Sequence, residues 1–221
     1  MIRSRLITGL IAVAALVGLA GAAPQHMTPR DDPPPPAPEL RVPQGRVLLE
    51  SDFRSHGSLE HWSPDKSGVW SVAHGALKAE LPDKKQARSL IYAGSEDWSQ
   101  YAVDLDVCQT RGVDKGVAVH VLGGRGVAVD LRGPGYHDVL LHLQEVPAGH
   151  ALVHNDNFVW HHLRVETLDG RFRVFVDGRL VLAEIDKRGS FPRGRIALAA
   201  YTGGAGRCTV YYDNVVVTAL R

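Results

Sequence analysis

The chain has 221 residues, a length that is ample for at least one domain with its own hydrophobic core. Its 25 basic and 24 acidic residues give a formal net charge of +1, and they form no basic run. This balance gives no electrostatic reason to expect binding to nucleic acid or to an anionic membrane surface.

The first 23 residues have the pattern of a secretory signal peptide. Arg3 and Arg5 form a basic start, residues 6–19 are apolar, and Ala20, Gly21 and Ala22 match a small-residue cleavage site. We therefore expect a secreted or periplasmic protein. The alternative is an uncleaved N-terminal membrane anchor, although the apolar run is short for a bilayer span.

Residues 24–45 are polar and rich in proline, with four consecutive prolines before Ala37. Such a composition favours extended polyproline II structure and buries little surface. We expect a disordered or semi-rigid linker, followed by one domain at residues 46–221. A ligand segment for a proline-recognition domain is the alternative.

From residue 46 onwards the sequence shows short strand patterns separated by turn-forming residues, and no window has a sustained helical period. This spacing predicts an all-β fold, a two-sheet antiparallel jelly-roll sandwich. Strands are expected at residues 47–53, 69–81, 89–93, 101–108, 116–122, 127–132, 138–146, 195–201 and 208–217.

Residues 160–185 give the most specific local prediction, three antiparallel strands joined by two Asp-Gly turns. Asp169-Gly170 and Asp177-Gly178 supply the positive φ angles of two-residue hairpin turns. If Leu168 pairs with Arg171, an apolar face and a polar face separate cleanly. The apolar face then pairs Leu163, Val165 and Thr167 with Val176, Val174 and Phe172, and the polar face places Glu166 opposite Arg173.

Export to an oxidising compartment also bears on the two cysteines. Cys108 ends one predicted strand and Cys208 begins another, so antiparallel pairing with the cysteines opposite each other predicts a disulfide between them. The alternative is two reduced, buried cysteines.

Several motifs together resemble the concanavalin A-like lectin/glucanase superfamily over about residues 47–220. They lie at residues 51–53, 70–72, 75–77, 101–107, 160–165, 174–178, 194–198 and 212–217. The nearest resemblance is to laminin-G-like jelly rolls and to 3-keto-disaccharide hydrolase, or family 16 glycoside hydrolase-like, domains. It implies two curved antiparallel sheets, with carbohydrate on the concave face or the rim loops.

The resemblance also implies where a cation and catalytic groups would lie. Jelly rolls of this kind often hold Ca²⁺ where an early loop meets the last strand, which here selects Asp52 and Asp213; a structural turn at Asp213-Asn214 is the alternative. The Glu-x-Asp-x-x-Glu strand of laminarinase-type members is not matched, because residues 184–189 lack the second glutamate. We therefore expect no catalytic carboxylate pair.

Polar residues on the meander at residues 116–146 are the candidate binding residues. If a bulge or an odd-length connection at residues 123–126 aligns them, they line one patch of a sheet that suits sugar hydroxyls. The candidates are His120, Asp130, Arg132, Tyr136, His142 and Gln144. Simple solvent exposure of these side chains is the alternative. The remaining histidines, including His137, His150 and His154, have no metal-ligand spacing.

The leading hypothesis is thus an exported, lectin-like domain whose partner is carbohydrate or another extracellular ligand. A glycoside-cleaving enzyme of the 3-keto-disaccharide hydrolase type is the second hypothesis. A structural or protein-interaction module is the third.

Overall fold

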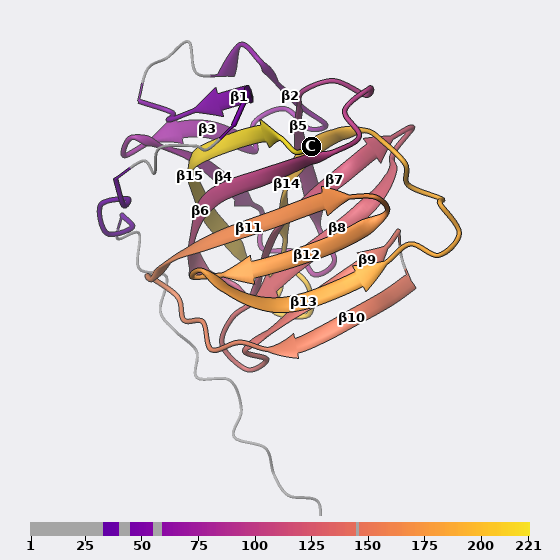
Figure 1. Ribbon diagram of the computed structural model, residues 1–221. Helices are drawn as coiled ribbons and strands as arrows, with labels where there is room; N and C mark the ends of the chain where they lie inside the picture. The colour runs from indigo at the N-terminus through magenta and orange to yellow at the C-terminus, as the bar shows by residue number, and fades with distance from the viewer. Residues whose placement is uncertain (1–32, 40–44, 55–58, 145) are drawn as a thin grey trace, which may run out of the picture.

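The computed structural model describes residues 33–39, 45–54, 59–144 and 146–221, which form two antiparallel β-sheets packed face to face (Figure 1). The predicted all-β, two-sheet sandwich is confirmed. The predicted signal peptide lies outside the described residues. No helix in the described part of the chain is long and apolar enough to cross a membrane.

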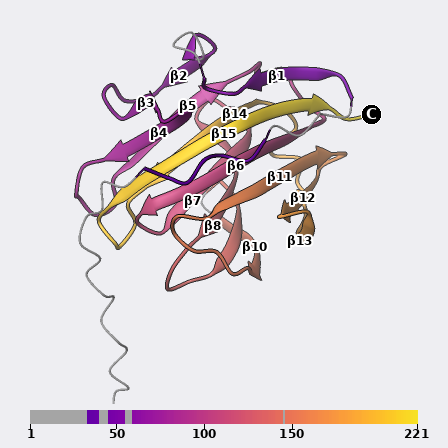
Figure 2. The same cartoon turned by 90° about the vertical axis from the view of Figure 1, so that its left-hand side faces the viewer.

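The first sheet has eight strands, and its longest strand, β15, lies near the middle (Figure 2). Its order is β13 (Arg179–Ile185), β12 (Arg171–Val176), β11 (Trp160–Leu168), β6 (Tyr101–Arg111), β15 (Cys208–Ala219), β4 (Ala76–Leu81) and β3 (Trp70–Ala73). The eighth strand, β1 (Val47–Ser51), pairs with the second half of β15, beyond the end of β4.

The second sheet has seven strands and is built around the predicted meander. Its order is β10 (Val146–Leu152), β9 (Asp138–Leu143), β8 (Arg125–Arg132), β7 (Asp114–Leu122), β14 (Arg195–Tyr201), β5 (Arg88–Ala93) and β2 (Trp62–Pro64).

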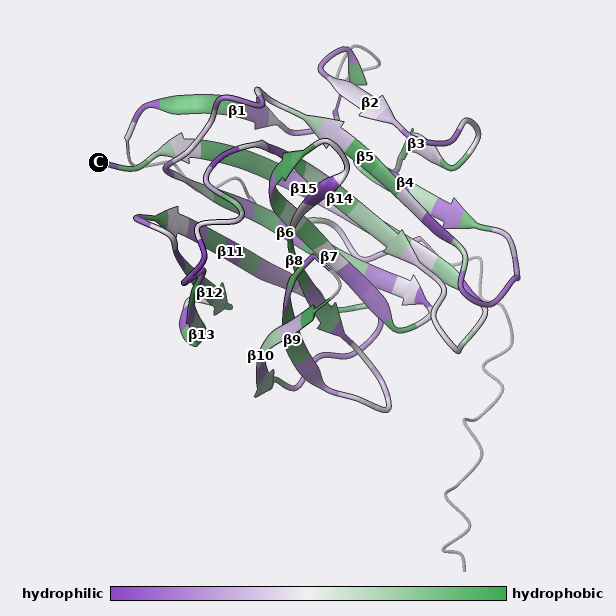
Figure 3. Ribbon diagram, turned by 90° about the vertical axis from the view of Figure 1, so that its right-hand side faces the viewer, coloured by the Kyte–Doolittle hydropathy of each residue, from purple (hydrophilic) through white to green (hydrophobic). Residues whose placement is uncertain are grey.

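Alternating side chains of both sheets fill the space between them. Leu105 of β6 and Leu163 of β11 meet Val129 of β8 and Leu198 of β14 in one core, and all four are fully buried. Hydrophobic colour follows the strands of both sheets, whereas the connecting loops are mainly white or purple (Figure 3). The core therefore fills the space between the sheets, and the outer faces and the connecting loops lie outside it.

The two Asp-Gly hairpins have the predicted register. Leu168 lies opposite Arg171, and the apolar pairs follow in the expected order. Asp169 and Asp177 have φ angles of 51° and 50°, as type I′ turns require. The guanidinium of Arg173 lies 2.6 Å from a carboxylate oxygen of Glu166 on the polar face.

Two strands were missed by the sequence prediction, and both lie at an edge of the second sheet. β2 is short and contains Pro64, which an edge strand tolerates because its N–H side has no partner. The single strand expected at residues 138–146 ends at Leu143, where Gln144 adopts a positive φ of 62°. β10 follows, and its Pro147 and Gly149 hid the strand pattern.

The disulfide prediction is wrong, and the alternative of two reduced, buried cysteines is confirmed. β6 and β15 do pair antiparallel, but Cys108 lies opposite Tyr211, and Cys208 lies opposite Leu81 of β4. Irregularities after Thr209 and Asp213 shift the register of β15 against β6. Such bulges have no recognisable sequence pattern. The expected regular pairing, with the two cysteines opposite each other, therefore had the wrong register.

Part of the predicted linker packs on the domain. Residues 33–39 cross the outer face of the first sheet, where Pro34 is buried (Figure 2). The indole Nε1 of Trp160 donates a hydrogen bond of 2.7 Å to the carbonyl oxygen of Pro35, and Asn214 Nδ2 donates one of 2.8 Å to Pro38. We call residues 33–39 the proline strap.

Candidate functional site

The outer face of the second sheet carries a groove of about 1360 Å³. Its floor consists of small side chains on neighbouring strands. Ala118 of β7 lies opposite Ala128 of β8, and Ala199 of β14 and Gly126 of β8 also line the groove. A cross-strand row of Gly and Ala leaves a hollow that larger side chains would fill.

Polar side chains of β8 and β9 form one wall of the groove. Asp130 and His142 face each other, with 3.5 Å between a carboxylate oxygen and the imidazole Nε2. Gln144 lies at the end of this wall, where its Oε1 accepts a hydrogen bond of 3.0 Å from Arg125. The structure therefore brings Asp130, His142 and Gln144 together, as the sequence analysis expected.

Arg132 extends this wall and is held firmly in place. Its Nε donates a hydrogen bond of 2.7 Å to Asp138, which also lies 3.0 Å from His150 Nε2. Burial pushes the pKa of Asp138 up, but the hydrogen bonds from Arg132 and His150 outweigh it and hold the pKa below its usual range. Tyr136 stacks on the Arg132 guanidinium at 4.2 Å and is more than half exposed, beside the groove rather than in it.

The opposite wall is aromatic and was missed by the sequence analysis. Tyr92 of β5 and Tyr201 of β14 line the groove, with the Arg195 guanidinium 4.5 Å above the Tyr92 ring. Tyr201 donates its hydroxyl hydrogen to Gln86 on the rim. Strand alternation could have identified Tyr201, because it lies on the same face of β14 as Ala197 and Ala199.

His120 does not belong to the groove, and its assignment to the polar patch is corrected here. A β-bulge between Val119 and Leu122 gives His120 a φ of 51° and turns its ring into the core, where only 3% of the residue is exposed. Its Nδ1 lies 2.6 Å from the Phe191 carbonyl oxygen and its Nε2 lies 2.9 Å from Thr167 Oγ1. Burial lowers the pKa of His120. Because its ring is buried and both ring nitrogens have partners in the core, its role is structural.

Asp114, at the start of β7, is an ionisable groove residue that the sequence analysis overlooked. Burial raises its pKa to about 6, and the negative charge of Asp130 adds to the rise. Asp114 and Asp130 both line the groove, and the pKa of Asp114 is raised. A carboxyl group with a raised pKa is a candidate general acid.

Asp52 and Asp213, the expected Ca²⁺ ligands, are engaged in backbone contacts. Asp213 Oδ1 accepts a hydrogen bond of 2.8 Å from the N–H of Asn214, whose φ of 51° marks the bulge in β15. Asp52 Oδ1 accepts one of 3.2 Å from the N–H of Arg54. These contacts fit the alternative of a structural turn at Asp213-Asn214.

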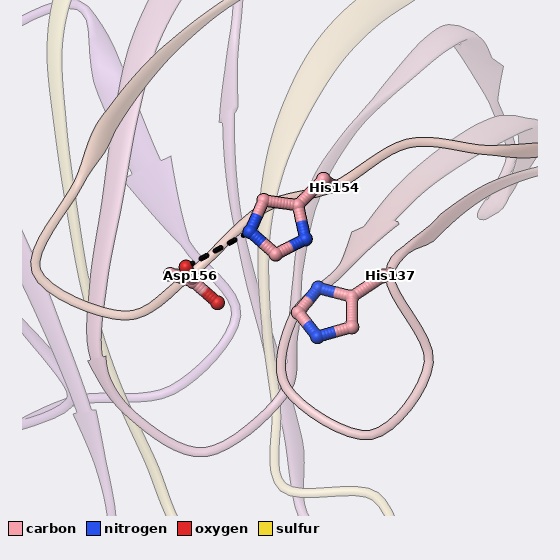
Figure 4. Close-up of side chains that lie close together, drawn as sticks. All are labelled: His137, His154 and Asp156. Atoms are coloured by element: carbon pink, nitrogen blue, oxygen red, sulfur yellow. Dashed lines mark hydrogen bonds and ion pairs between the residues drawn. The ribbon is translucent and has the colours of Figure 1, made fainter.

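Within the described ranges, one group of three or more His, Cys, Asp or Glu side chains has converging donor atoms, and it lies away from Asp52 and Asp213. It consists of His137, His154 and Asp156 (Figure 4). The sequence analysis did not bring these residues together.

Comparison with known proteins gives similarity at the level of the fold. No protein-family model and no curated protein matches the chain. Among solved structures, carbohydrate binding module CBM66 from Bacillus subtilis has a TM-score of 0.61 and 17% identity, over 72% of this chain and 96% of that chain. A Bacillus subtilis protein of unknown function with a galectin-like fold has a TM-score of 0.66 and 12% identity, over 80% and 97%.

An enzyme is also among the similar structures. The Crh5 transglycosylase in complex with NAG has a TM-score of 0.62 and 14% identity, over 82% of this chain and 88% of that chain. The same two-sheet architecture thus occurs in a binding module, in a galectin-like protein and in a transglycosylase. The domain is a concanavalin A-like β-sandwich, as the sequence resemblance predicted.

Proposed function

We propose that this domain binds carbohydrate in the groove on the second sheet. The observation that carries the proposal is the groove's construction, a floor of small residues between a wall of planar polar groups and an aromatic wall. Sugar hydroxyls pair well with carboxylate, imidazole and guanidinium groups, and the C–H faces of sugar rings pack on tyrosine rings. CBM66, a carbohydrate binding module of the same fold, supports the proposal.

The dimensions of the groove favour an oligosaccharide over a single sugar. It crosses β9, β8, β7, β14 and β5. Adjacent strands lie about 4.8 Å apart, so the groove is about 19 Å wide across these strands, room for several sugar rings. The signal-peptide pattern at residues 1–23 supports a ligand outside the cytoplasm.

A glycan array followed by titration of the best ligand tests this proposal. We expect Asp130→Asn and Tyr201→Ala each to weaken binding at least about 10-fold, which corresponds to about 1.4 kcal/mol. Arg179→Ala, an exposed change on β13 of the other sheet, is the matched control and should leave the affinity unchanged. Failure of every glycan to bind, or equal affinity of the groove variants and the wild type, would overturn the proposal.

Asp114 supports a second candidate function, acid-catalysed cleavage or transfer of a glycosidic bond. Its carboxyl group, with a pKa raised to about 6 mainly by burial, would act as the acid, and Asp130 would act as the base or nucleophile. The Crh5 transglycosylase shows that the same fold supports glycoside chemistry.

Turnover of a glycoside panel decides between binding and catalysis. We expect Asp114→Asn to lower kcat at least about 100-fold, since general acid catalysis contributes about 10²–10⁴-fold. The rate should fall as the pH rises above about 6, because the acid must be protonated. Asp97→Asn, which changes an exposed carboxylate outside the groove, is the control. Absence of turnover by the wild type would eliminate this second function and leave the binding proposal intact.

A further inference from the structure

The loop between β10 and β11 and the turn between β8 and β9 bring two imidazoles and one carboxylate into a single cluster (Figure 4). One donor atom from each of His137, His154 and Asp156 lies within 4.8 Å of the other two. The two imidazole rings are stacked, with centroids 4.5 Å apart and an interplanar angle of 20°. The cluster lies outside the proposed carbohydrate groove.

The scaffold under this cluster is rigid. Asn155, between His154 and Asp156, is fully buried. Its Oδ1 lies 2.8 Å from Lys115 Nζ, and its Nδ2 donates hydrogen bonds to the carbonyl oxygens of Arg132 at 2.7 Å and Val153 at 3.0 Å. These contacts fix the loop to the turn that carries His137, so the neighbouring side chains are presented from a fixed backbone.

The orientation of His137 suits a metal ligand. Its Nδ1 lies 3.0 Å from the carbonyl oxygen and 3.3 Å from the backbone nitrogen of Asn155, so the Asn155 backbone holds this ring nitrogen. In the tautomer with the proton on Nδ1, the ring donates to the carbonyl oxygen and the lone pair on Nε2 is open to a metal, an arrangement common for metal-bound histidine. His137 also has a left-handed φ of 51°, which the turn imposes.

His154 and Asp156 form the exposed half of the cluster. Their side chains are 77% and 51% exposed, and His154 Nε2 lies 3.1 Å from Asp156 Oδ2. Donor atoms in a tetrahedral zinc site lie about 3.4 Å apart, given metal–ligand distances of about 2.0–2.2 Å. We expect rotation of the two exposed side chains to bring the donor atoms to this separation.

We propose that His137, His154 and Asp156 form a site for a divalent transition-metal ion of the zinc type. Two imidazole nitrogens favour Zn²⁺, Cu²⁺ or Ni²⁺ over Ca²⁺ and Mg²⁺, which prefer oxygen donors. One carboxylate with two neutral imidazoles offers a net charge of −1 to the cation. Three protein ligands leave a fourth position for water.

Isothermal titration of the untagged full chain with ZnCl₂ at pH 7.5 tests this proposal. We expect one saturable site that His154→Ala weakens at least about 10-fold, and Asp156→Asn weakens in the same direction. His154 is largely exposed, so its removal should leave the fold intact. His61→Ala, at an exposed histidine on another loop, is the matched control and should bind Zn²⁺ like the wild type.

Cobalt provides an independent measurement on the same variants. A tetrahedral site should give Co²⁺ visible absorption bands that disappear in His137→Ala and in His154→Ala but persist in His61→Ala. The proposal is overturned if the wild type shows no saturable zinc binding at Zn²⁺ concentrations up to about 100 μM. It is equally overturned if the three ligand variants bind Zn²⁺ as tightly as the wild type.

Discussion

One extra residue in β7 decides the environment of His120. Without the bulge, strict alternation would place its imidazole beside Ala118 on the groove face. With the bulge, the ring lies between Tyr101 and Phe172, at centroid distances of 5.3 Å and 5.6 Å. Both ring nitrogens then find partners inside the core, which makes this histidine a structural residue.

Replacement of His120 should reduce stability and not ligand affinity. His120→Ala removes packing in the core and deprives the Phe191 carbonyl oxygen of its partner, a loss of about 2–4 kcal/mol in the free energy of unfolding. Urea denaturation measures this loss. The exposed change His61→Ala should stay within about 0.5 kcal/mol of the wild type. A His120→Ala variant as stable as the wild type would contradict the structural role.

The pH dependence of stability gives a second test of His120. Because burial lowers the pKa of its imidazole, only the unfolded chain takes up the proton just below the ordinary pKa of 6.5. The stabilising contribution is therefore complete above pH 6.5 and is lost as the pH falls. The stability difference between wild type and His120→Gln should shrink from pH 7.5 to pH 5, and a constant difference would contradict the assignment.

At the scale of secondary-structure elements, the proline strap extends the sandwich beyond its sheets. Residues 33–39 lie on the first sheet through one buried proline and hydrogen bonds from Trp160 and Asn214. A proline-rich segment loses little entropy when it docks, because its unfolded form is already extended. Two side-chain donors therefore suffice to hold it.

Removal of the indole N–H should detach part of the strap. Trp160→Phe keeps an aromatic ring but loses the donor to Pro35, and we expect a loss of about 0.5–1.5 kcal/mol in unfolding free energy. The control is the same substitution in a chain that lacks residues 1–39, where the loss attributable to this hydrogen bond should vanish. Equal losses in the two backgrounds would show that the strap contact contributes nothing.

Elements with local determinants could be predicted from the sequence, whereas those that depend on bulges could not. The two Asp-Gly turns fix the register of β11, β12 and β13 through residues adjacent in the chain. The pairing of β6 with β15 joins strands about 100 residues apart, and its bulges after Thr209 and Asp213 shifted the expected partner of Cys108. A long-range register has no comparable local signal.

The residues of the candidate site also divide into those with a local sequence signal and those without one. Asp130, His142 and Gln144 were found because alternation within one meander places them on one face. Tyr92 and Tyr201 come from β5 and β14, which are distant from the meander in sequence. His137 lies on a turn and His154 on a separate loop. No short-range spacing in the sequence predicts that the two side chains are close together.

The outer faces of the two sheets carry different features. The first sheet carries the strap on its outer face, and the second carries the hollow with its polar and aromatic walls. The concanavalin A-like fold occurs in a binding module and in a transglycosylase, so the fold alone does not assign a function to this chain. We propose that carbohydrate binds in the groove of the second sheet.

Residue-resolved NMR titration with the best array glycan locates the binding surface on the domain. We predict that amide shifts concentrate on Ala128, Asp130, Ala199 and Tyr201, in the groove of the second sheet. Amides of the exposed hairpin residues Arg171 and Arg179, on the other sheet, should stay unperturbed. Shifts centred on the first sheet, with none in the groove, would show that carbohydrate does not bind in the groove.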